Sequence, residues 1–488
     1  MTRTERADVI VIGGGSAAFE AAVAAKDAGA ENVVMLEKAP EGEYGGNARY
    51  SGTGFRFWHR GAEEIRELVE DGDFDGIEIA PYTKDDFASD LARMTQKRMD
   101  PVLSAMLVEQ SNAAVHWMKD VGIRWELLKE HAKVGNKRYF ERGIAVHVAG
   151  GGPGQLEQWR RIAERRGIEL RFSSAVSAIH GNMHAIEGVR VSTHGGDYDL
   201  EAPALIVCAG GFQASAEMRA RYLSGHADLV KVRGSKHDTG EILSALVALG
   251  AATAGEWQSG HMSPIDAKAP DFETPQHADG RGNTMSRYDY GFGITVNALG
   301  LRFFDEGEAQ HSYTYAKTGR AILSEPGAVA WQIYDQTGIR QHRYPHHKAT
   351  FEEAGDIEEL ARRAGLEPRV LVHTVNEFNA ACGDEPFNPT MPDGKKTRGL
   401  AIPKSNWAVP IVTPPFRAYP VTCGITFTFG GVKVNSNAQV LNTLHEPIKG
   451  LYASGDILGL FFHNYPAFTG QTRNAVFSRL AGEYAAKP

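Results

Sequence analysis

Residues 9–18 read VIVIGGGSAA, and this stretch decides the fold. Its four β-branched residues predict a short, buried, parallel strand. The alanine-rich run that follows predicts a helix over 16–28, which ends near Gly29. A second strand is expected over 33–36 and stops at Glu37. The order of strand, glycine turn, helix and strand is that of a nucleotide-binding βαβ unit.

The glycine turn has the form G-x-G-x-x-A. Gly13 makes the tight turn, Gly15 lets a pyrophosphate approach the first amides of the helix, and Ala18 lets helix and strand pack closely. Glu37 lies about twenty residues further on, where an acid binds two ribose hydroxyls. A purely structural turn is the alternative, but strand, turn, helix and acid all fall at the spacing that a dinucleotide site needs.

A second glycine-rich segment follows, with Gly45-Gly46-Asn47 and then Ser51-Gly52. Its backbone is able to run flat against a flavin ring, although an ordinary flexible loop has the same composition. Near the other end of the chain, a predicted strand runs into Gly455-Asp456, and this acid is suited to ribitol hydroxyls. A helix expected to begin near 470–474 is placed to stabilise negative charge on the N1–C2=O edge of a flavin.

Length and composition narrow the class of protein. A chain of 488 residues is long enough for two or three domains. Its net charge of −8 argues against nucleic acid as a main partner. Its three cysteines are widely separated, so they form neither a CxxC redox pair nor a zinc-ligand set, and no metal site is expected. No apolar run approaches the roughly 18 residues of a membrane helix, and the N-terminus has no apolar signal core, so we expect a cytoplasmic protein.

The rest of the chain predicts a domain order. Helical periodicity marks an insertion near 61–145, and a second βα arrangement with a meander follows over 150–191. Residues 256–291 are rich in Pro, Gly, His and Asp and predict long ordered loops of a second domain. The predicted boundaries are 1–255 for the first part of a dinucleotide-binding domain, 256–405 for a second domain, and 406–488 for the return to the first.

Several motifs together resemble the flavoprotein family of fumarate reductase and succinate dehydrogenase. They are VIVIGGGSAAFEAAVAAKDAGA, GGNARYSG, LIVCAGGF, VNALGLRFFDE, PPFRAYPVTCGITFTFGGVKVN and GLYASGDILG. The resemblance implies an α/β fold in which a Rossmann-like FAD-binding domain is interrupted by a smaller α+β capping domain. The runs SYTYAKTGRAIL and HNYPAFTGQTRNAVFSRLAG are most similar to tricarballylate dehydrogenase-like members of this family.

This resemblance implies FAD as the cofactor. No histidine lies between Asn47 and Gly52 to tether it, so we expect FAD to be bound non-covalently. The residues expected to bind it are Gly13, Gly15, Ser16, Ala17, Glu37, Lys38, Gly46, Asn47, Ser51, Gly52, Val176, Ala209, Gly210, Gly455, Asp456 and Thr472.

The chain departs from the fumarate reductase pattern at three places. Phe427 stands where a histidine precedes the family's Thr-x-Gly-Gly segment, and the proton-delivering arginine is replaced near Gln310. The arginine that follows an asparagine in the last motif is Tyr465, beside Asn464. These replacements argue against fumarate as the substrate.

The leading hypothesis is an FAD-dependent dehydrogenase or reductase that acts on a C–C bond beside a carboxylate or ketone and exchanges a hydride with flavin N5. Tricarballylate is a first guess for a polycarboxylate substrate. We expect Arg473 and His463 to anchor the substrate and Tyr313 or His311 to transfer the proton, with Tyr465 also at the site.

Two alternatives remain open at this stage. Tyr465-Pro466, followed by small residues and Thr472, is also similar to 3-ketosteroid 1,2-dehydrogenases. The chain is alternatively a flavin electron-transfer subunit without a substrate of its own. The sequence has no haem-attachment or cluster-ligand pattern, so we expect electrons to pass to a separate protein, a quinone or oxygen.

Overall fold

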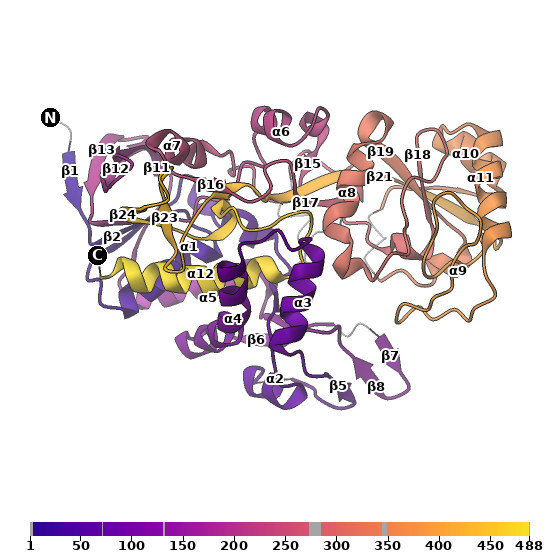
Figure 1. Ribbon diagram of the computed structural model, residues 1–488, viewed down its shortest axis with the longest axis horizontal. Coiled ribbons are helices and arrows are strands. Elements are labelled where there is room, and N and C mark those ends of the chain that lie inside the picture. Colours follow the sequence, from indigo (N-terminus) through magenta and orange to yellow (C-terminus); the bar gives the residue numbers. More distant parts are fainter. Residues whose placement is uncertain (1–2, 71, 130–131, 273–284, 344–348, 488) are drawn as a thin grey trace.

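The computed structural model describes residues 3–70, 72–129, 132–272, 285–343 and 349–487. Figure 1 shows an elongated molecule with a parallel sheet and its helices at one end, a second sheet at the other, and a small helical group beside them. Among the described residues, no helix is both long enough and apolar enough to cross a membrane.

A six-stranded sheet forms the larger part of the molecule, in the order β10-β3-β2-β14-β24-β23. Its first five strands are parallel, and β23 pairs antiparallel at the edge. The four residues of each of β2, β3 and β14 are all buried, as expected for strands covered on both faces. The strands are β2 Val9–Ile12, β3 Val33–Leu36, β10 Glu169–Arg171, β14 Ala204–Val207, β23 Gln439–Leu441 and β24 Pro447–Ala453.

The strand order reverses between β2 and β14. The chain passes from β2 outward to β3 on one side, whereas β14 and β24 lie on the other side. Ligands bind in the crevice outside the carboxyl ends of the strands at such a switch point. Gly13 directly follows β2 and Cys208 directly follows β14, so this crevice lies at the glycine turn that the sequence singled out.

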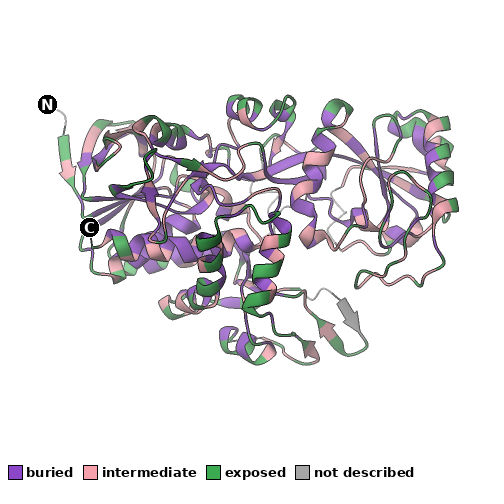
Figure 2. Ribbon diagram, in the orientation of Figure 1, coloured by how far each residue is buried: buried purple, intermediate pink, exposed green. Residues whose placement is uncertain are grey.

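Three helices pack around this sheet: α1 Ser16–Asp27, α5 Gly151–Arg165 and α12 Thr469–Ala485. Every residue of α1 from Ser16 to Ala25 is buried, and Figure 2 shows the helix enclosed. A Cβ atom added to Gly482 of α12 would lie 2.4 Å from the backbone oxygen of Ala21. The alanines of α1 and this glycine therefore allow the two helices to approach closely.

A meander and a helical insertion complete this part of the chain. The meander forms a separate sheet in the order β1-β13-β12-β11. The insertion predicted near 61–145 contains three helices and short strands, and α4 packs against α12. The elements are β1 Arg3–Arg6, β4 Gly54–Arg56, α2 Ala62–Leu68, β5 Ile77–Glu78, α3 Lys84–Met94, α4 Pro101–Val121, β6 Trp125–Leu127, β7 Ala132–Val134, β8 Lys137–Tyr139, β9 Ile144–Val148, β11 Ala175–Gly181, β12 Ile186–Thr193, β13 Gly196–Glu201, α6 Ala216–Tyr222 and α7 Glu241–Leu249.

The second large sheet has the order β15-β21-β19-β18, and β17 and β20 also pair with β21. The centre of this sheet is β21, a strand of 13 residues. Its start, at Phe416 and Ala418, belongs to a second apolar core with α10 and α11, whereas Cys423, Ile425 and Phe427 belong to the main core. The elements are β15 Lys231–Val232, β16 Thr253–Ala254, β17 Gly260–Asp266, β18 Ile294–Asn297, α8 Tyr315–Leu323, β19 Val329–Tyr334, α9 Gln336–Ile339, β20 Glu352–Ala354, α10 Ile357–Ala364, α11 Pro368–Ala381, β21 Phe416–Thr428 and β22 Gly431–Val432.

One prediction about this region was wrong. Residues 260–266, expected to be loop, form the fully buried strand β17. The sequence of this strand, GHMSPID, contains polar residues and a proline and has no strand periodicity. Pairing with β21 keeps the segment extended, so the sequence alone did not predict it. Part of the predicted loop, residues 273–284, lies outside the described residues. Pro420 lies inside β21 opposite Trp331.

Candidate active site

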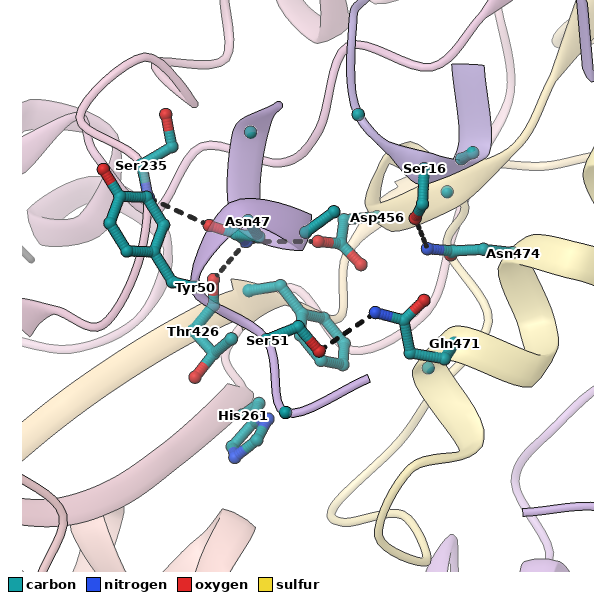
Figure 3. A pocket seen from close by; sticks show the side chains of 18 of the residues that line it. Ser16, Asn47, Tyr50, Ser51, Ser235, His261, Thr426, Asp456, Gln471 and Asn474 are labelled. Atoms are coloured by element: carbon teal, nitrogen blue, oxygen red, sulfur yellow. Dashed lines mark hydrogen bonds between the residues drawn. The ribbon is translucent and has the colours of Figure 1, made fainter. Parts of the chain in front are cut away.

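One cavity of about 1490 Å³ runs from the glycine turn to the second sheet. This volume exceeds the roughly 300–1,000 Å³ of an ordinary small-molecule pocket, so it has room for a dinucleotide and a substrate together. Figure 3 shows side chains from the glycine-rich N-terminal segments, from β17 and β21, and from the start of α12 facing the same space.

One side of the cavity, here called the dinucleotide wall, is formed by Gly13, Gly15, Glu37, Ala209 and Asp456. Gly13 has φ 121°, and a Cβ atom there would lie 2.4 Å from the backbone oxygen of Cys208. A Cβ atom on Gly15 would meet only Gly45 O at 3.4 Å, so the backbone at Gly15 is open to the cavity. The α1 helix starts there without a side-chain cap. Its first amide groups are therefore available to a pyrophosphate, and the wall fits FAD.

Buried carboxyl groups line the same wall. Glu37 accepts a hydrogen bond from the backbone N–H of Ala39 at 2.7 Å, and burial raises its pKa. Asp238, which the sequence did not single out, accepts a hydrogen bond from Gln213 Nε2 at 2.8 Å. Burial raises the pKa of Asp238 well above its usual value, and nearby Asp456 adds to the effect. These buried carboxyl groups therefore suit the hydroxyl groups of a ligand better than a ligand group that carries negative charge.

Asn47 joins three segments that are distant in the sequence. Its Nδ2 donates to Thr426 O at 2.7 Å and to Asp456 Oδ2 at 3.2 Å, and its Oδ1 accepts from the backbone N–H of Ser235 at 3.1 Å. Figure 3 shows these three bonds at the centre of the wall. The predicted cofactor residue Asn47 therefore lines the cavity and also holds Asp456 in place.

Arg473 lies behind the cavity and not in it. Its Nη2 donates to Asp456 Oδ1, and its side chain is 1% exposed. Its guanidinium carbon lies 5.2 Å from the ring centroid of Phe427 and 5.4 Å from that of Phe461. That Arg473 anchors the substrate stays a prediction, and the ion pair holds its guanidinium at the back of the dinucleotide wall.

The opposite part of the cavity is lined by five rings, here called the aromatic cluster: His261, Tyr288, Tyr315, Phe427 and Tyr465. The His261 ring lies edge-on to Tyr315 at 4.8 Å, to Tyr465 at 5.4 Å and to Phe427 at 5.6 Å. Tyr288 lies 5.0 Å from Tyr315. These side chains come from β17, α8, β21 and the segments before β18 and α12, so only tertiary structure brings them together.

A hydrogen-bonded chain runs through the aromatic cluster. The Tyr465 hydroxyl lies 2.8 Å from His261 Nδ1 and 3.4 Å from the Tyr315 hydroxyl. Burial lowers the pKa of His261 well below its usual value, so the imidazole is neutral at pH 7. Burial also raises the pKa of both tyrosines, so their hydroxyls keep their protons. His261 Nε2 is buried without a hydrogen-bond partner among the described residues.

The other predicted residues divide into two groups. All the predicted cofactor residues except Thr472 line the cavity, and so do His311 and Tyr465. Thr472 Oγ1 instead donates to Arg56 O at 2.6 Å and ties α12 to β4. Tyr313 donates to Asp90 at 3.1 Å, and His463 contacts Arg320 at 3.2 Å. Thr472, Tyr313 and His463 are not among the described cavity-lining residues, and their contacts with cofactor or substrate stay predictions.

Sequence reasoning missed His261, Asp238, Glu141, Arg233 and Arg343, which all line the cavity. His261 and Asp238 lie in segments without a recognisable motif, and Glu141 belongs to the insertion. One signal in the sequence pointed to such residues. Phe427, Gln310 and Tyr465 replace the histidine and the two arginines of the fumarate reductase pattern, so other parts of the chain must complete the site.

The fold and the dinucleotide wall define a flavin-dependent oxidoreductase. The family model described as "FAD binding domain" matches residues 8–472, and the chain belongs to this family. Its cofactor is FAD, and it acts on CH–CH or C=C bonds, as the curated relatives and the structural neighbour below do.

Three similar proteins illustrate the range of the family. "Probable fumarate reductase Ifc3" of Shewanella frigidimarina (strain NCIMB 400) is 29% identical over 99% of this chain and 75% of its own length. "3-oxosteroid 1-dehydrogenase" of Mycobacterium tuberculosis (strain ATCC 25618 / H37Rv) is 23% identical, over 94% of each chain. The open conformation of a flavocytochrome c3 fumarate reductase matches with a TM-score of 0.72 and 26% identity, over 99% of this chain and 78% of that one.

Proposed function

We propose that the protein oxidises or reduces a C–C bond next to a ketone in a largely apolar substrate that binds against the aromatic cluster. The observation that carries this proposal is the chain Tyr315, Tyr465 and His261, whose hydroxyls and imidazole face the same cavity as the dinucleotide wall. A carbonyl oxygen becomes more negative when a neighbouring C–H bond loses its proton. Fixed hydroxyl donors in a site of low polarity stabilise that charge.

Each residue has a distinct part in this proposal. The Tyr465 and Tyr315 hydroxyls stay protonated and donate to the carbonyl oxygen. Neutral His261 donates from Nδ1–H to the Tyr465 oxygen, which leaves the hydroxyl proton of Tyr465 for the carbonyl oxygen. Phe427 and Tyr288 exclude water and pack against the apolar body of the substrate. Bound FAD supplies the acceptor or donor of the hydride.

FAD is bound non-covalently in this proposal. No histidine lies between Asn47 and Gly52, and the cofactor contacts expected from the wall are backbone amides and carboxyl groups. A separate molecule exchanges electrons with the flavin. Residues 256–405 act as a cap that carries much of the aromatic cluster, while the segments before and after them carry the dinucleotide wall.

A carboxylate substrate is the second candidate. Arg233 and Arg343 line the cavity, and Arg233 donates to Thr426 Oγ1 at 2.6 Å. Two guanidinium groups favour an anionic group such as the carboxylate of a polycarboxylate, with tricarballylate as one example. A third reading, an electron-transfer subunit without a substrate, leaves the hydroxyl chain of the aromatic cluster without a role.

Anaerobic spectroscopy of the FAD-loaded protein tests the proposal. Saturated ketosteroids, other cyclic ketones and polycarboxylates are added to oxidised enzyme, and their unsaturated counterparts to chemically reduced enzyme. We expect ketones to bleach the flavin, or enones to restore its colour. Polycarboxylates acting instead would favour the second candidate, and no change with any compound would favour the third.

A variant pair tests the role of the hydroxyl chain. We expect Tyr465→Phe to slow flavin reduction about 10²–10³-fold, which is typical for loss of one such donor. Tyr484→Phe is the control, because Tyr484 is 42% exposed on α12. Unchanged rates in Tyr465→Phe would contradict the assignment.

A further inference from the structure

Glu141 is a carboxyl group of the cavity that the proposed function does not yet use. It lies between β8 and β9 in the helical insertion, lines the cavity, and has a side chain that is only 12% exposed. Ser312 Oγ donates to Glu141 Oε1. Ser312 also lines the cavity and adjoins His311, whose ring lies 6.0 Å from Tyr288 of the aromatic cluster. Glu141 therefore lies near the proposed substrate region, although it belongs to the helical insertion and the aromatic cluster does not.

The charges around Glu141 come from three elements. Arg56 of β4 lies 3.9 Å away through Nη2, Arg343 follows α9, and Asp90 of α3 faces Arg56 from the other side at 3.7 Å. Burial raises the pKa of Glu141 to about 7, although the two arginines oppose this shift. Such a carboxyl group exchanges a proton readily near neutral pH.

Arg56, the charged neighbour of Glu141, belongs to a polar network that extends towards the surface. Arg56, which is fully buried, also donates from Nη1 to the Tyr82 hydroxyl at 3.4 Å. The Tyr82 and Tyr313 hydroxyls donate to Asp90 Oδ2 at 2.9 and 3.1 Å. Asp90 accepts from Arg93 at 2.8 Å, and the Arg93 side chain is 56% exposed. This network therefore fixes Arg56 beside Glu141 and ends at the exposed Arg93.

The reaction needs such a group. Oxidation of a CH–CH bond removes one hydride and one proton, and the tyrosines of the aromatic cluster hold their protons too tightly to serve as bases at neutral pH. Neutral His261 is engaged by Tyr465 through Nδ1. The other buried acids described above, Glu37 and Asp238, belong to the side that holds the cofactor.

We propose that Glu141 accepts the proton released from the substrate carbon during oxidation and returns it during reduction. One C–H bond breaks with its electron pair, which leaves as hydride to FAD. The other C–H bond breaks as a proton passes to the Glu141 carboxylate, and its electron pair forms the C=C bond. The resulting carboxylic acid then releases the proton to water. Ser312 and Arg56 position Glu141. This inference rests on the proposed function.

Two variants and two readouts test it. Glu141→Gln keeps the acceptor for Ser312 but carries no exchangeable carboxyl proton, and Glu141→Asp restores one. We expect Glu141→Gln to keep FAD and to bind substrate, but to reduce the flavin about 10²–10⁴-fold more slowly in single turnovers. The wild-type oxidation rate should rise with pH to a plateau above about pH 7, and the variant should lose this rise. Glu141→Asp should recover part of the rate and part of its rise with pH. The control is Glu78→Gln, because Glu78 is an exposed acid of β5.

Infrared spectroscopy supplies a readout that needs no substrate. The wild-type holoenzyme should show a protonated-carboxyl band that disappears around pH 7 and is missing in Glu141→Gln. Absence of this band overturns the inference whether or not any substrate is found. A wild-type rate and pH profile in Glu141→Gln overturns it while the proposed function stands. If no compound changes the wild-type flavin, the proposed function fails, and the catalytic use of Glu141 fails with it.

Discussion

Glu20 is a buried acid whose replacement should stabilise the protein. It lies in α1 with a fully buried side chain, packed between the sheet and α12. Burial raises its pKa from 4.5 to about 8, although Ser478 and Arg473 favour the charged form. Between these two values the unfolded chain loses this proton and the folded chain keeps it. The contribution of Glu20 to stability is therefore highest below pH 4.5 and falls as pH rises towards 8.

The size of the effect follows from this shift. pH 7 lies 2.5 pH units above the unfolded-state pKa of 4.5. At 1.36 kcal/mol per unit, ionisation of Glu20 stabilises the unfolded wild-type chain by about 3.4 kcal/mol, and Glu20→Gln avoids this loss of folding stability. With an unfolding entropy of about 2.1 cal/mol/K per residue over 488 residues, this equals about 3 °C in melting temperature. At pH 5 the same reasoning predicts less than about 1 °C.

Thermal unfolding of the FAD-loaded protein at several pH values measures this difference. Circular dichroism and flavin fluorescence are followed at one heating rate at pH 5, 6, 7 and 8. We expect the melting temperature of Glu20→Gln to exceed that of the wild type by an amount that grows with pH. Glu31→Gln, at an exposed position after α1, is the matched control. A difference that is the same at every pH would refute the reasoning.

Two further predictions concern α12. Arg473→Ala should weaken FAD binding at least about tenfold, because the largely enclosed Asp456 loses its ion pair and is left as an uncompensated charge. Titration of apoprotein with FAD measures this change. Arg473→Lys should recover part of the affinity, and unchanged affinity in Arg473→Ala would contradict the assignment. Gly482→Ala should lower the free energy of unfolding by about 1–3 kcal/mol, because its Cβ atom would lie 2.4 Å from Ala21 O. Urea unfolding checks this value, and Ala486→Gly at the helix end is a control that should not produce the same loss through crowding.

The dinucleotide side of the protein was predictable from short stretches of sequence. The strand, glycine turn and helix at Gly13 to Ala18 are encoded by adjacent residues, and so is the Gly455-Asp456 turn. Backbone geometry imposes these patterns locally, because only glycine tolerates the required φ values and close contacts. The cofactor residues predicted in this way line the cavity, except Thr472, whose hydroxyl donates to Arg56 O.

The substrate side was decided by tertiary structure alone. His261, Tyr288, Tyr315, Phe427 and Tyr465 are distant in sequence, and their meeting depends on β17 pairing with β21 and on α8 packing against β17. The same is true of Arg473, whose position follows from its partner Asp456 and not from its motif. A side chain's contacts depend on which segments pack around it, and no local pattern records that arrangement. The sequence by itself determined the fold class and the cofactor wall, and long-range packing decided which polar groups face the substrate.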